Sequence, residues 1–186
     1  MVFTVPNAIT VARLLGVPLF IYLMLGPQHD LAALLVLAVG GSTDWFDGWA
    51  ARRLGQVSRL GTLLDPTVDR LYIVATLLVF TLREIVPWWF AGALLARELV
   101  LLAALALLRR AGYGPLPVHY LGKTATFILL AAFPTLLFAV AVPAASDWAY
   151  PVGWALGWWG LVLYWAAAVL YLTQAGQLLR RQPRVP

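Results

Sequence analysis

The sequence predicts an all-α integral membrane protein, a bundle of six transmembrane helices, because three observations agree. Of the 186 residues, 62% are hydrophobic and 11% are charged, whereas a soluble domain carries about 25% charged residues. Six mostly apolar segments reach the length of about 20 residues that a helix needs to cross a bilayer. Basic residues gather at the ends of these segments, as expected of charges that set membrane topology. We expect one domain over residues 1–186.

The six segments are separated by residues that favour turns. Glycine and proline lie in most of the connections, as in Gly26-Pro27 and at Pro87, where they interrupt helices. The predicted helices are Ala8–Leu25, Leu31–Ala51, Leu64–Val86, Trp88–Leu108, Leu121–Val142 and Val152–Leu172.

The distribution of lysine and arginine predicts the orientation of the bundle. Nine basic residues fall after the second and fourth predicted helices and in the C-terminal tail: Arg52, Arg53, Arg59, Arg109, Arg110, Lys123, Arg180, Arg181 and Arg184. The other three connections contain only Arg83. Because basic loops stay in the cytoplasm, both termini are expected there. The net charge of +5 therefore predicts topology and not nucleic-acid binding.

Four of the eight acidic residues lie in one window at this predicted cytoplasmic surface. Asp44 and Asp47 are three positions apart, and Asp65 and Asp69 are four apart, so each pair shares one face of a helix. Four carboxylates at the edge of an apolar phase are unfavourable unless they are neutralised. Two divalent cations would neutralise them, and all-oxygen ligands favour Mg²⁺, Mn²⁺ or Ca²⁺ over zinc. Such a pair of ions suits phosphoryl displacement.

The residues between the aspartates favour a substrate rich in phosphate. Gly48 and Ala51 remove bulk from the face that carries the first pair, which permits close approach to the backbone. Arg52 follows one turn later and can donate several hydrogen bonds to a phosphate. Gly61 precedes Asp65 by one turn and repeats this arrangement.

The whole window resembles the signature of the CDP-alcohol phosphotransferase family, D-x2-D-G-x2-A-R-x8-G-x3-D-x3-D, at every fixed position. The resemblance implies a six-helix membrane bundle, typically a homodimer, that transfers a phosphatidyl or related group from a CDP-linked donor to an alcohol and releases CMP. It implies two divalent cations, Mg²⁺ or Mn²⁺, and Asp69 as the base for the acceptor hydroxyl. The implied metal ligands are Asp44, Asp47, Asp65 and Asp69, and the implied cytidine diphosphate pocket contains Gly48, Ala51, Arg52 and Gly61.

Residues outside the window extend the resemblance. The segment PNAITVAR is similar to an N-terminal family pattern in which Asn7, Thr10 and Arg13 face the active cleft, with Asn7 and Thr10 beside the nucleotide. An alternative is that Asn7 only caps a helix. Arg13, Arg97 and Lys123 are candidates for binding the acceptor. Arg97 and Glu98 are alternatively a structural pair, and Lys123 is alternatively a lysine that extends to the membrane surface.

Within the family, the phrases DWFDGWAARR and LLDPTVDR resemble the branch of phosphatidylglycerophosphate synthases and cardiolipin synthases. The former usually show Gly-Lys-x-Lys-Thr at the fifth helix, where this chain has Ala125 in GKTAT. Glycerol 3-phosphate is a dianion, so losing a cation there weakens its capture. The resemblance therefore implies transfer from CDP-diacylglycerol to phosphatidylglycerol, giving cardiolipin, with glycerol 3-phosphate as the alternative acceptor and an inositol phosphate ranked lower. It implies a bacterial plasma membrane location with the site facing the cytoplasm.

Two other classes of membrane protein are weighed against this hypothesis. Intramembrane prenyltransferases also use aspartate pairs and Mg²⁺, but they are larger bundles whose two motifs lie far apart in the chain. A carboxylate-based transporter would spread its acids along a path across the membrane. Here four acids gather within one short window, which favours the transferase.

Overall fold

A computed structural model describes residues 5–41, 59–114 and 120–180, with side chains from residue 11 to 41, 70 to 114 and 120 to 180. Every regular element within those ranges is a helix, which confirms the predicted all-α class. The chain divides into two compact units, Met1–Pro87 with Pro134–Tyr150, and Trp88–Phe133 with Pro151–Pro186.

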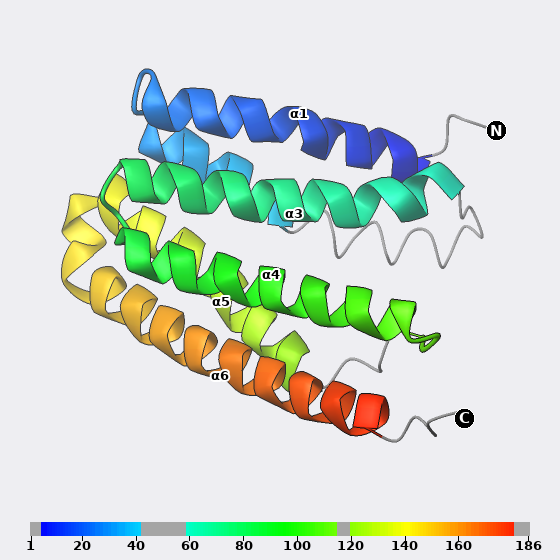
Figure 1. The fold of residues 1–186 in the computed structure, drawn as a ribbon. Helices are drawn as coiled ribbons and strands as arrows, with labels where there is room; N and C mark the ends of the chain where they lie inside the picture. Colours follow the sequence, from blue (N-terminus) through cyan, green and yellow to red (C-terminus); the bar gives the residue numbers. More distant parts are fainter. Residues whose placement is uncertain (1–4, 42–58, 115–119, 181–186) are drawn as a thin grey trace, which may run out of the picture. The chain divides into compact units, whose positions relative to one another are not determined.

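The first unit contains α1 (Val5–Leu25), the helix Asp30–Gly41 and α3 (Arg59–Leu82). Helices α1 and α3 pack along each other, as Figure 1 shows. On α1 the buried side chains Phe20 and Met24 are four residues apart, which places them on one helical face. Helices α1 and α3 run in the same direction, as Figure 1 shows.

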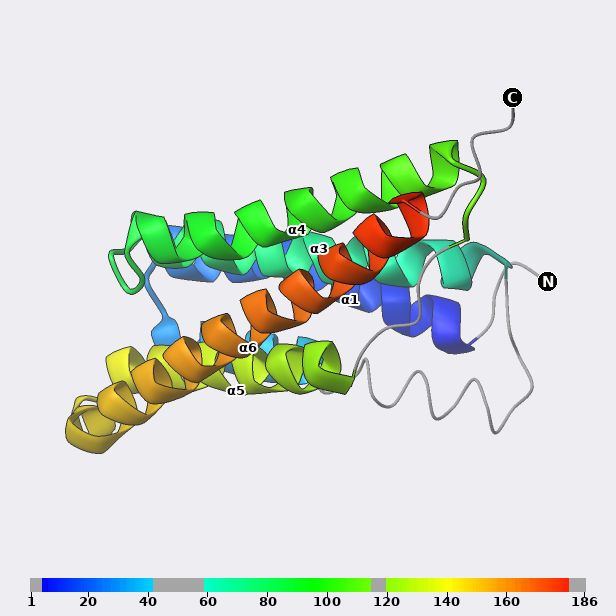
Figure 2. The same ribbon diagram turned by 60° about the horizontal axis from the view of Figure 1, so that its bottom comes forward.

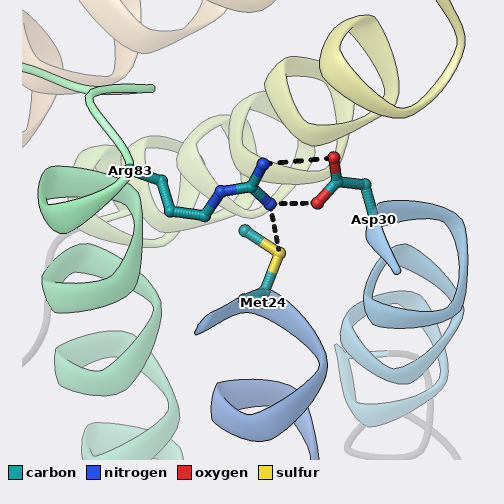
Figure 3. A network of polar contacts seen from close by, with 3 residues as sticks. All are labelled: Met24, Asp30 and Arg83. Atoms are coloured by element: carbon teal, nitrogen blue, oxygen red, sulfur yellow. Dashed lines mark hydrogen bonds and ion pairs between the residues drawn. The ribbon is translucent and has the colours of Figure 1, made fainter. Parts of the chain in front are cut away.

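An ion pair joins the helices of this unit at one end. Both terminal guanidinium nitrogens of Arg83, just beyond α3, donate to the two carboxylate oxygens of Asp30 (Figure 3). One of these nitrogens also lies 3.8 Å from the sulfur of Met24, near the end of α1. Arg83, expected as a lone basic residue on the far side of the membrane, therefore ties three helix ends together.

The second unit is built on α4 (Trp88–Arg110), the first part of α5 (Tyr120–Ala141) and most of α6 (Ser146–Arg180). Helix α6 has 35 residues, so it is roughly 50 Å long at 1.5 Å per residue. Figure 2 shows it as one continuous helix. It packs closely on α5, because a Cβ at Gly160 would lie 2.7 Å from two carbons of Leu129.

The observed helix ends lie within five residues of the predicted ones, except in α6 and at the predicted end of the second helix, Ala51, which lies outside the described residues. The predicted helix Val152–Leu172 lengthens at both ends, and a short 3-10 helix, Pro143–Ala145, leads into it. Helix α4 ends in a Schellman turn: Gly112 has φ of 81°, and the Tyr113 amide donates to the Leu108 carbonyl at 2.9 Å. Glycine is favoured at this position, because other residues rarely adopt a positive φ.

Three helical segments of the described chain are long and apolar enough to cross a membrane: Trp88–Arg110, Tyr120–Ala141 and Pro143–Arg180. Shorter apolar segments occupy Val11–Leu25 and Asp30–Gly41, and also Arg70–Leu82. These segments indicate a membrane protein, as the composition predicts. The count of six spans remains a prediction.

The basic ends of two helices in the second unit lie together. The Tyr113 hydroxyl, just after α4, donates to the Leu178 carbonyl near the end of α6 at 3.2 Å. Arg109 and Arg110 end α4, and Arg180 ends α6. The two helices therefore run in the same direction, as the predicted grouping of basic loops requires.

Candidate active site

Helix α3 carries one half of the aspartate window. Gly61, Asp65 and Asp69 all lie within this helix, so Asp65 and Asp69 occupy positions one turn apart on the same face, as the spacing predicts. Their side chains are outside the described part of the structure. The other half of the window lies wholly outside the described residues: Asp44, Asp47, Gly48, Ala51 and Arg52.

Elsewhere the described side chains offer no second metal centre. Between residues 11 and 41, 70 and 114, and 120 and 180, no three His, Cys, Asp or Glu side chains gather as ligands. The carboxylates of the aspartate window are a donor set whose chemistry fits Mg²⁺ or Mn²⁺.

Helix α1 carries the N-terminal candidates. It begins at Val5, so Asn7 lies inside the helix and does not cap it, in contrast to the alternative role considered for this residue. Thr10 follows in the same helix, and the side chains of both residues are outside the described part. Arg13 is described and is only 5% exposed. A buried cation inside an apolar helix is costly without polar or charged partners, so Arg13 is unlike a residue that only sets topology.

Arg13 lies three positions before Gly16 on α1, and the hydroxyl of Tyr72 on α3 lies where a Cβ at Gly16 would be placed. Tyr72 lies three positions after Asp69 in the same helix, so these two positions share a face. Arg13 is thereby linked to the aspartate-bearing part of α3 through a neighbour that the sequence did not single out.

Arg97 and Glu98 lie near the middle of α4 and form a cluster with Tyr164 of α6. An Arg97 terminal nitrogen donates to a Glu98 carboxylate oxygen at 2.8 Å, and the Tyr164 hydroxyl donates to that same oxygen. The guanidinium carbon of Arg97 lies 3.8 Å from the centre of the Tyr164 ring, within the range of a cation–π contact. The structural pairing considered for Arg97 and Glu98 is therefore present, with Tyr164 as a third member.

The cluster leaves part of Arg97 without a hydrogen bond. Its Nε is buried and has no partner among the described residues, although an arginine offers five donors. Glu98 accepts from two donors and is about one-third exposed. Arg97 is thus held by Glu98 and Tyr164, and its buried Nε–H is still available as a hydrogen-bond donor. The sequence did not identify Tyr164 as a site residue. An Arg-Glu pair within an apolar helix nevertheless indicates that another polar side chain contacts the pair.

Lys123 and Ala125 lie on different faces of α5. Lys123 is exposed, and its Nζ lies 5.7 Å from the centre of the Tyr120 ring. Ala125 is completely buried. A side chain at position 125 therefore points into the protein, whereas the lysine two positions earlier lies on a face that is open in the described chain.

The sequence comparisons agree with the signature. The profile described as CDP-alcohol phosphatidyltransferase matches residues 3–172. A Streptomyces coelicolor protein named cardiolipin synthase (CMP-forming) is 51% identical over 184 residues, which cover 96% of this chain and 86% of the relative. A Mycobacterium tuberculosis protein with a provisional cardiolipin synthase name is 44% identical over 184 residues, covering 99% of this chain and 88% of the relative.

A more distant relative carries a different activity in its name. The Escherichia coli CDP-diacylglycerol–glycerol-3-phosphate 3-phosphatidyltransferase is 31% identical over 185 residues, covering 96% of this chain and 94% of the relative. Family profile and relatives both span nearly the whole chain, including every residue of the aspartate window. The chain therefore belongs to the CDP-alcohol phosphatidyltransferase family and is an enzyme of that kind.

Proposed function

We propose that the protein is a cardiolipin synthase, which transfers the phosphatidyl group of CDP-diacylglycerol to a hydroxyl of phosphatidylglycerol and releases cardiolipin and CMP. The observation that carries this choice is the 51% identity to a CMP-forming cardiolipin synthase over almost the full chain. The membrane-embedded helices suit it, because both lipid substrates reside in the bilayer.

The buried position of Ala125 supports phosphatidylglycerol as the acceptor. In the Gly-Lys-x-Lys-Thr pattern associated with phosphatidylglycerophosphate synthases, a second lysine would stand at this position. Because position 125 points inward, that lysine would place a cation inside the protein, where it could pair with the dianionic phosphate of glycerol 3-phosphate. Alanine supplies no cation, and phosphatidylglycerol, which has only a phosphodiester, has less need of one.

The second candidate function is phosphatidylglycerophosphate synthesis with glycerol 3-phosphate as acceptor. It is favoured by the 31% identity to an enzyme named for that reaction. Exposed Lys123 keeps the first lysine of the pattern, so part of that acceptor chemistry is present in the chain.

The reaction we propose exchanges one phosphorus–oxygen bond for another. The acceptor hydroxyl oxygen attacks the β-phosphorus of the donor, its proton passes to the Asp69 carboxylate, and the bond to CMP breaks so that CMP leaves with the electron pair. Asp44, Asp47, Asp65 and Asp69 would hold two divalent cations, Mg²⁺ or Mn²⁺. When bound, these ions would stabilise the negative charge that develops on the phosphoryl group and on CMP.

The remaining residues position the substrates. Gly48, Ala51 and Gly61 give the nucleotide clearance, Arg52 donates to its phosphates, and Asn7 and Thr10 line the same pocket. Phosphoryl transfer depends mainly on such positioning and on charge stabilisation. Arg13 and Arg97 are proposed to approach the acceptor phosphodiester, a role that suits guanidinium groups in apolar helices, where Arg13 is buried and the side chain of Arg97 is 12% exposed.

We also propose the arrangement of the enzyme in its membrane. Six helices span the bacterial plasma membrane, both termini and the aspartate window face the cytoplasm, and two copies form a homodimer. The grouping of basic residues at the joined ends of α4 and α6 supports this orientation.

The test uses purified protein in mixed micelles with CDP-diacylglycerol and either phosphatidylglycerol or glycerol 3-phosphate. We expect CMP and cardiolipin from the first acceptor only, and we expect a chelator to abolish their release. Asp69→Asn, which keeps the size of the side chain, should reduce turnover by about a thousandfold or more if Asp69 is the base. Consumption of glycerol 3-phosphate alone would reject the proposed acceptor.

A further inference from the structure

Three helices of the first unit meet around the ring of Tyr72. Tyr72 projects from α3 between Gly16 of α1 and Gly40 at the end of the helix Asp30–Gly41. Its hydroxyl lies where a Cβ at Gly16 would be placed, and the same hydroxyl would lie 2.9 Å from a Cβ at Gly40. Real Cβ atoms essentially never approach other heavy atoms within 3.0 Å. Both glycines are therefore required for the ring to sit between these helices.

The two glycines make different contacts with the tyrosine. At Gly16 only the hydroxyl obstructs a Cβ, because the next atom, the ring carbon Cζ, would lie 3.5 Å away. At Gly40 the ring itself obstructs, with Cζ at 3.0 Å and Cε1 at 3.3 Å. Removing the hydroxyl would thus make room for a side chain at Gly16 but not at Gly40.

In the sequence, this packing site is close to both halves of the aspartate window. On α3, Tyr72 follows Asp69 by three positions and Asp65 by seven, so the three positions share one face. In the sequence, Asp44 comes four positions after Gly40 and Asp47 seven positions after it. The tyrosine therefore separates the helix that bears the second aspartate pair from the helix that leads into the first.

A buried charge marks the same place. Arg13, 5% exposed, precedes Gly16 by three positions on α1, so these two positions share a face of that helix. A buried charge thus lies on the same face of α1 as the glycine against which Tyr72 packs.

We propose that Tyr72 is a positioning residue: seated between Gly16 and Gly40, it sets the spacing between α3, which carries Asp65 and Asp69, and the helix Asp30–Gly41, which precedes Asp44 and Asp47 in the chain, and hence the affinity of the metal site. The inference rests on the proposed metal-dependent function. A densely packed interior transmits a small displacement without absorbing it, so a change of one methyl group at this contact should reach ligands a turn away.

The experiment measures Mn²⁺ binding to purified protein by electron paramagnetic resonance, without substrate, alongside thermal unfolding and CMP release. We expect Gly16→Ala to weaken Mn²⁺ binding by about tenfold or more, because the new Cβ displaces Tyr72. Adding Tyr72→Phe should restore binding to within about threefold of the parent, since only the hydroxyl obstructs the Cβ. Gly40→Ala should weaken binding similarly, and Tyr72→Phe should not restore it.

The matched control is Gly92→Ala in α4, where a Cβ meets nothing within 4 Å; it should match the parent in Mn²⁺ binding and in CMP release. Should Gly16→Ala fail to fold, Tyr72→Leu tests the same contact by leaving it underfilled, and it should weaken Mn²⁺ binding by about fivefold. Unchanged Mn²⁺ affinity in Gly16→Ala or Tyr72→Leu would overturn the inference, as would equal rescue at both glycines.

Failure of the inference is distinguishable from failure of the proposed function. If the parent binds Mn²⁺ but converts neither acceptor, the proposed function fails while the binding series still decides the role of Tyr72. If the parent makes cardiolipin but the glycine variants bind Mn²⁺ normally, only the role of Tyr72 is rejected.

Discussion

Two arginines in apolar surroundings, one in each unit, are used in opposite ways. Arg83 directs both terminal nitrogens to the two oxygens of Asp30, so the charges meet in a bidentate pair. Arg97 shares a single oxygen of Glu98 with Tyr164 and keeps a buried Nε that has no hydrogen-bond partner among the described residues. The first arginine is satisfied by the fold, and the second retains capacity for a ligand.

The difference teaches how to separate structural from functional charges in a membrane bundle. A polar group inside the apolar phase must be compensated. Where the fold supplies the full compensation, as for Arg83, removing the pair should cost stability. Where the fold compensates only in part, as for Arg97, the missing partner is expected to be a substrate group, here the acceptor phosphodiester.

The largest effect is expected at Arg97. Arg97→Gln removes the charge and the planar donor array, so kcat/KM for phosphatidylglycerol should fall by about a hundredfold. The KM for CDP-diacylglycerol should stay within about twofold of the parent, because the donor is held by other residues. Steady-state kinetics with each lipid varied in turn measures both quantities.

Arg97→Lys is the matched variant for this prediction. It keeps the charge but loses the fork of donors, so it should recover only part of the lost activity. An Arg97→Gln enzyme with normal acceptor kinetics and lowered stability would place Arg97 in the same structural class as Arg83.

The next effect concerns stability at the other arginine. Asp30→Asn leaves Arg83 without its counter-charge at a site where both side chains are about one-sixth exposed. We expect the free energy of unfolding to fall by roughly 1–3 kcal/mol, somewhat less than for a fully buried pair. Tryptophan fluorescence during thermal unfolding in detergent would show it, with turnover per folded molecule unchanged.

Asp147→Asn is the control for this variant, because Asp147 is exposed in the first turn of α6. Its loss should cost less than about 1 kcal/mol, the size of a surface interaction with a helix dipole. If Asp30→Asn instead lowered turnover while the protein remained as stable as its parent, the contrast between the two arginines would fail.

The helices of this fold could be predicted from the sequence because their causes are local. Apolar length and turn residues located α4 to within two residues at each end. Helix α6 was predicted too short, because a stretch of about 20 residues was taken as sufficient to cross the bilayer, and the observed helix continues through Pro151. The proline lies near the start of the helix, where its missing N–H removes few intrahelical bonds.

The partners of the site residues could not be predicted, because their causes are not local. Tyr164 meets Glu98 across 66 positions of sequence, and Tyr72 meets Gly16 across 56 positions. Spacing within a helix predicts which residues share a face, but not which face of another helix lies opposite. The aspartate signature, by contrast, is a pattern of local spacings, so it identified the family before any fold was known.

Tyr164→Phe sharpens the comparison with a smaller expected effect. The ring remains beneath the Arg97 guanidinium, but Glu98 loses one of its two donors. Glu98 should then hold Arg97 less firmly, so the KM for phosphatidylglycerol should rise by about three- to fivefold with kcat nearly unchanged. A fall in kcat with an unchanged KM would contradict this positioning role.

The smallest effect is expected at Lys123. The sequence left two roles open for this residue: binding the acceptor, or extending to the membrane surface. Its exposed position near Tyr120 favours the second role, because a flexible lysine at a helix start can extend to lipid head groups without entering the protein. Lys123→Ala should therefore change the KM for phosphatidylglycerol by less than about twofold at a fixed surface concentration of anionic lipid. A large rise in the KM of Lys123→Ala for phosphatidylglycerol would instead show that this lysine reaches the acceptor, and that the exposed face of α5 contributes to the site.

The matched variant at the inward position is Ala125→Lys, with Ala125→Met as a neutral control for side-chain size. If an inward cation selects the acceptor, only Ala125→Lys should gain activity with glycerol 3-phosphate.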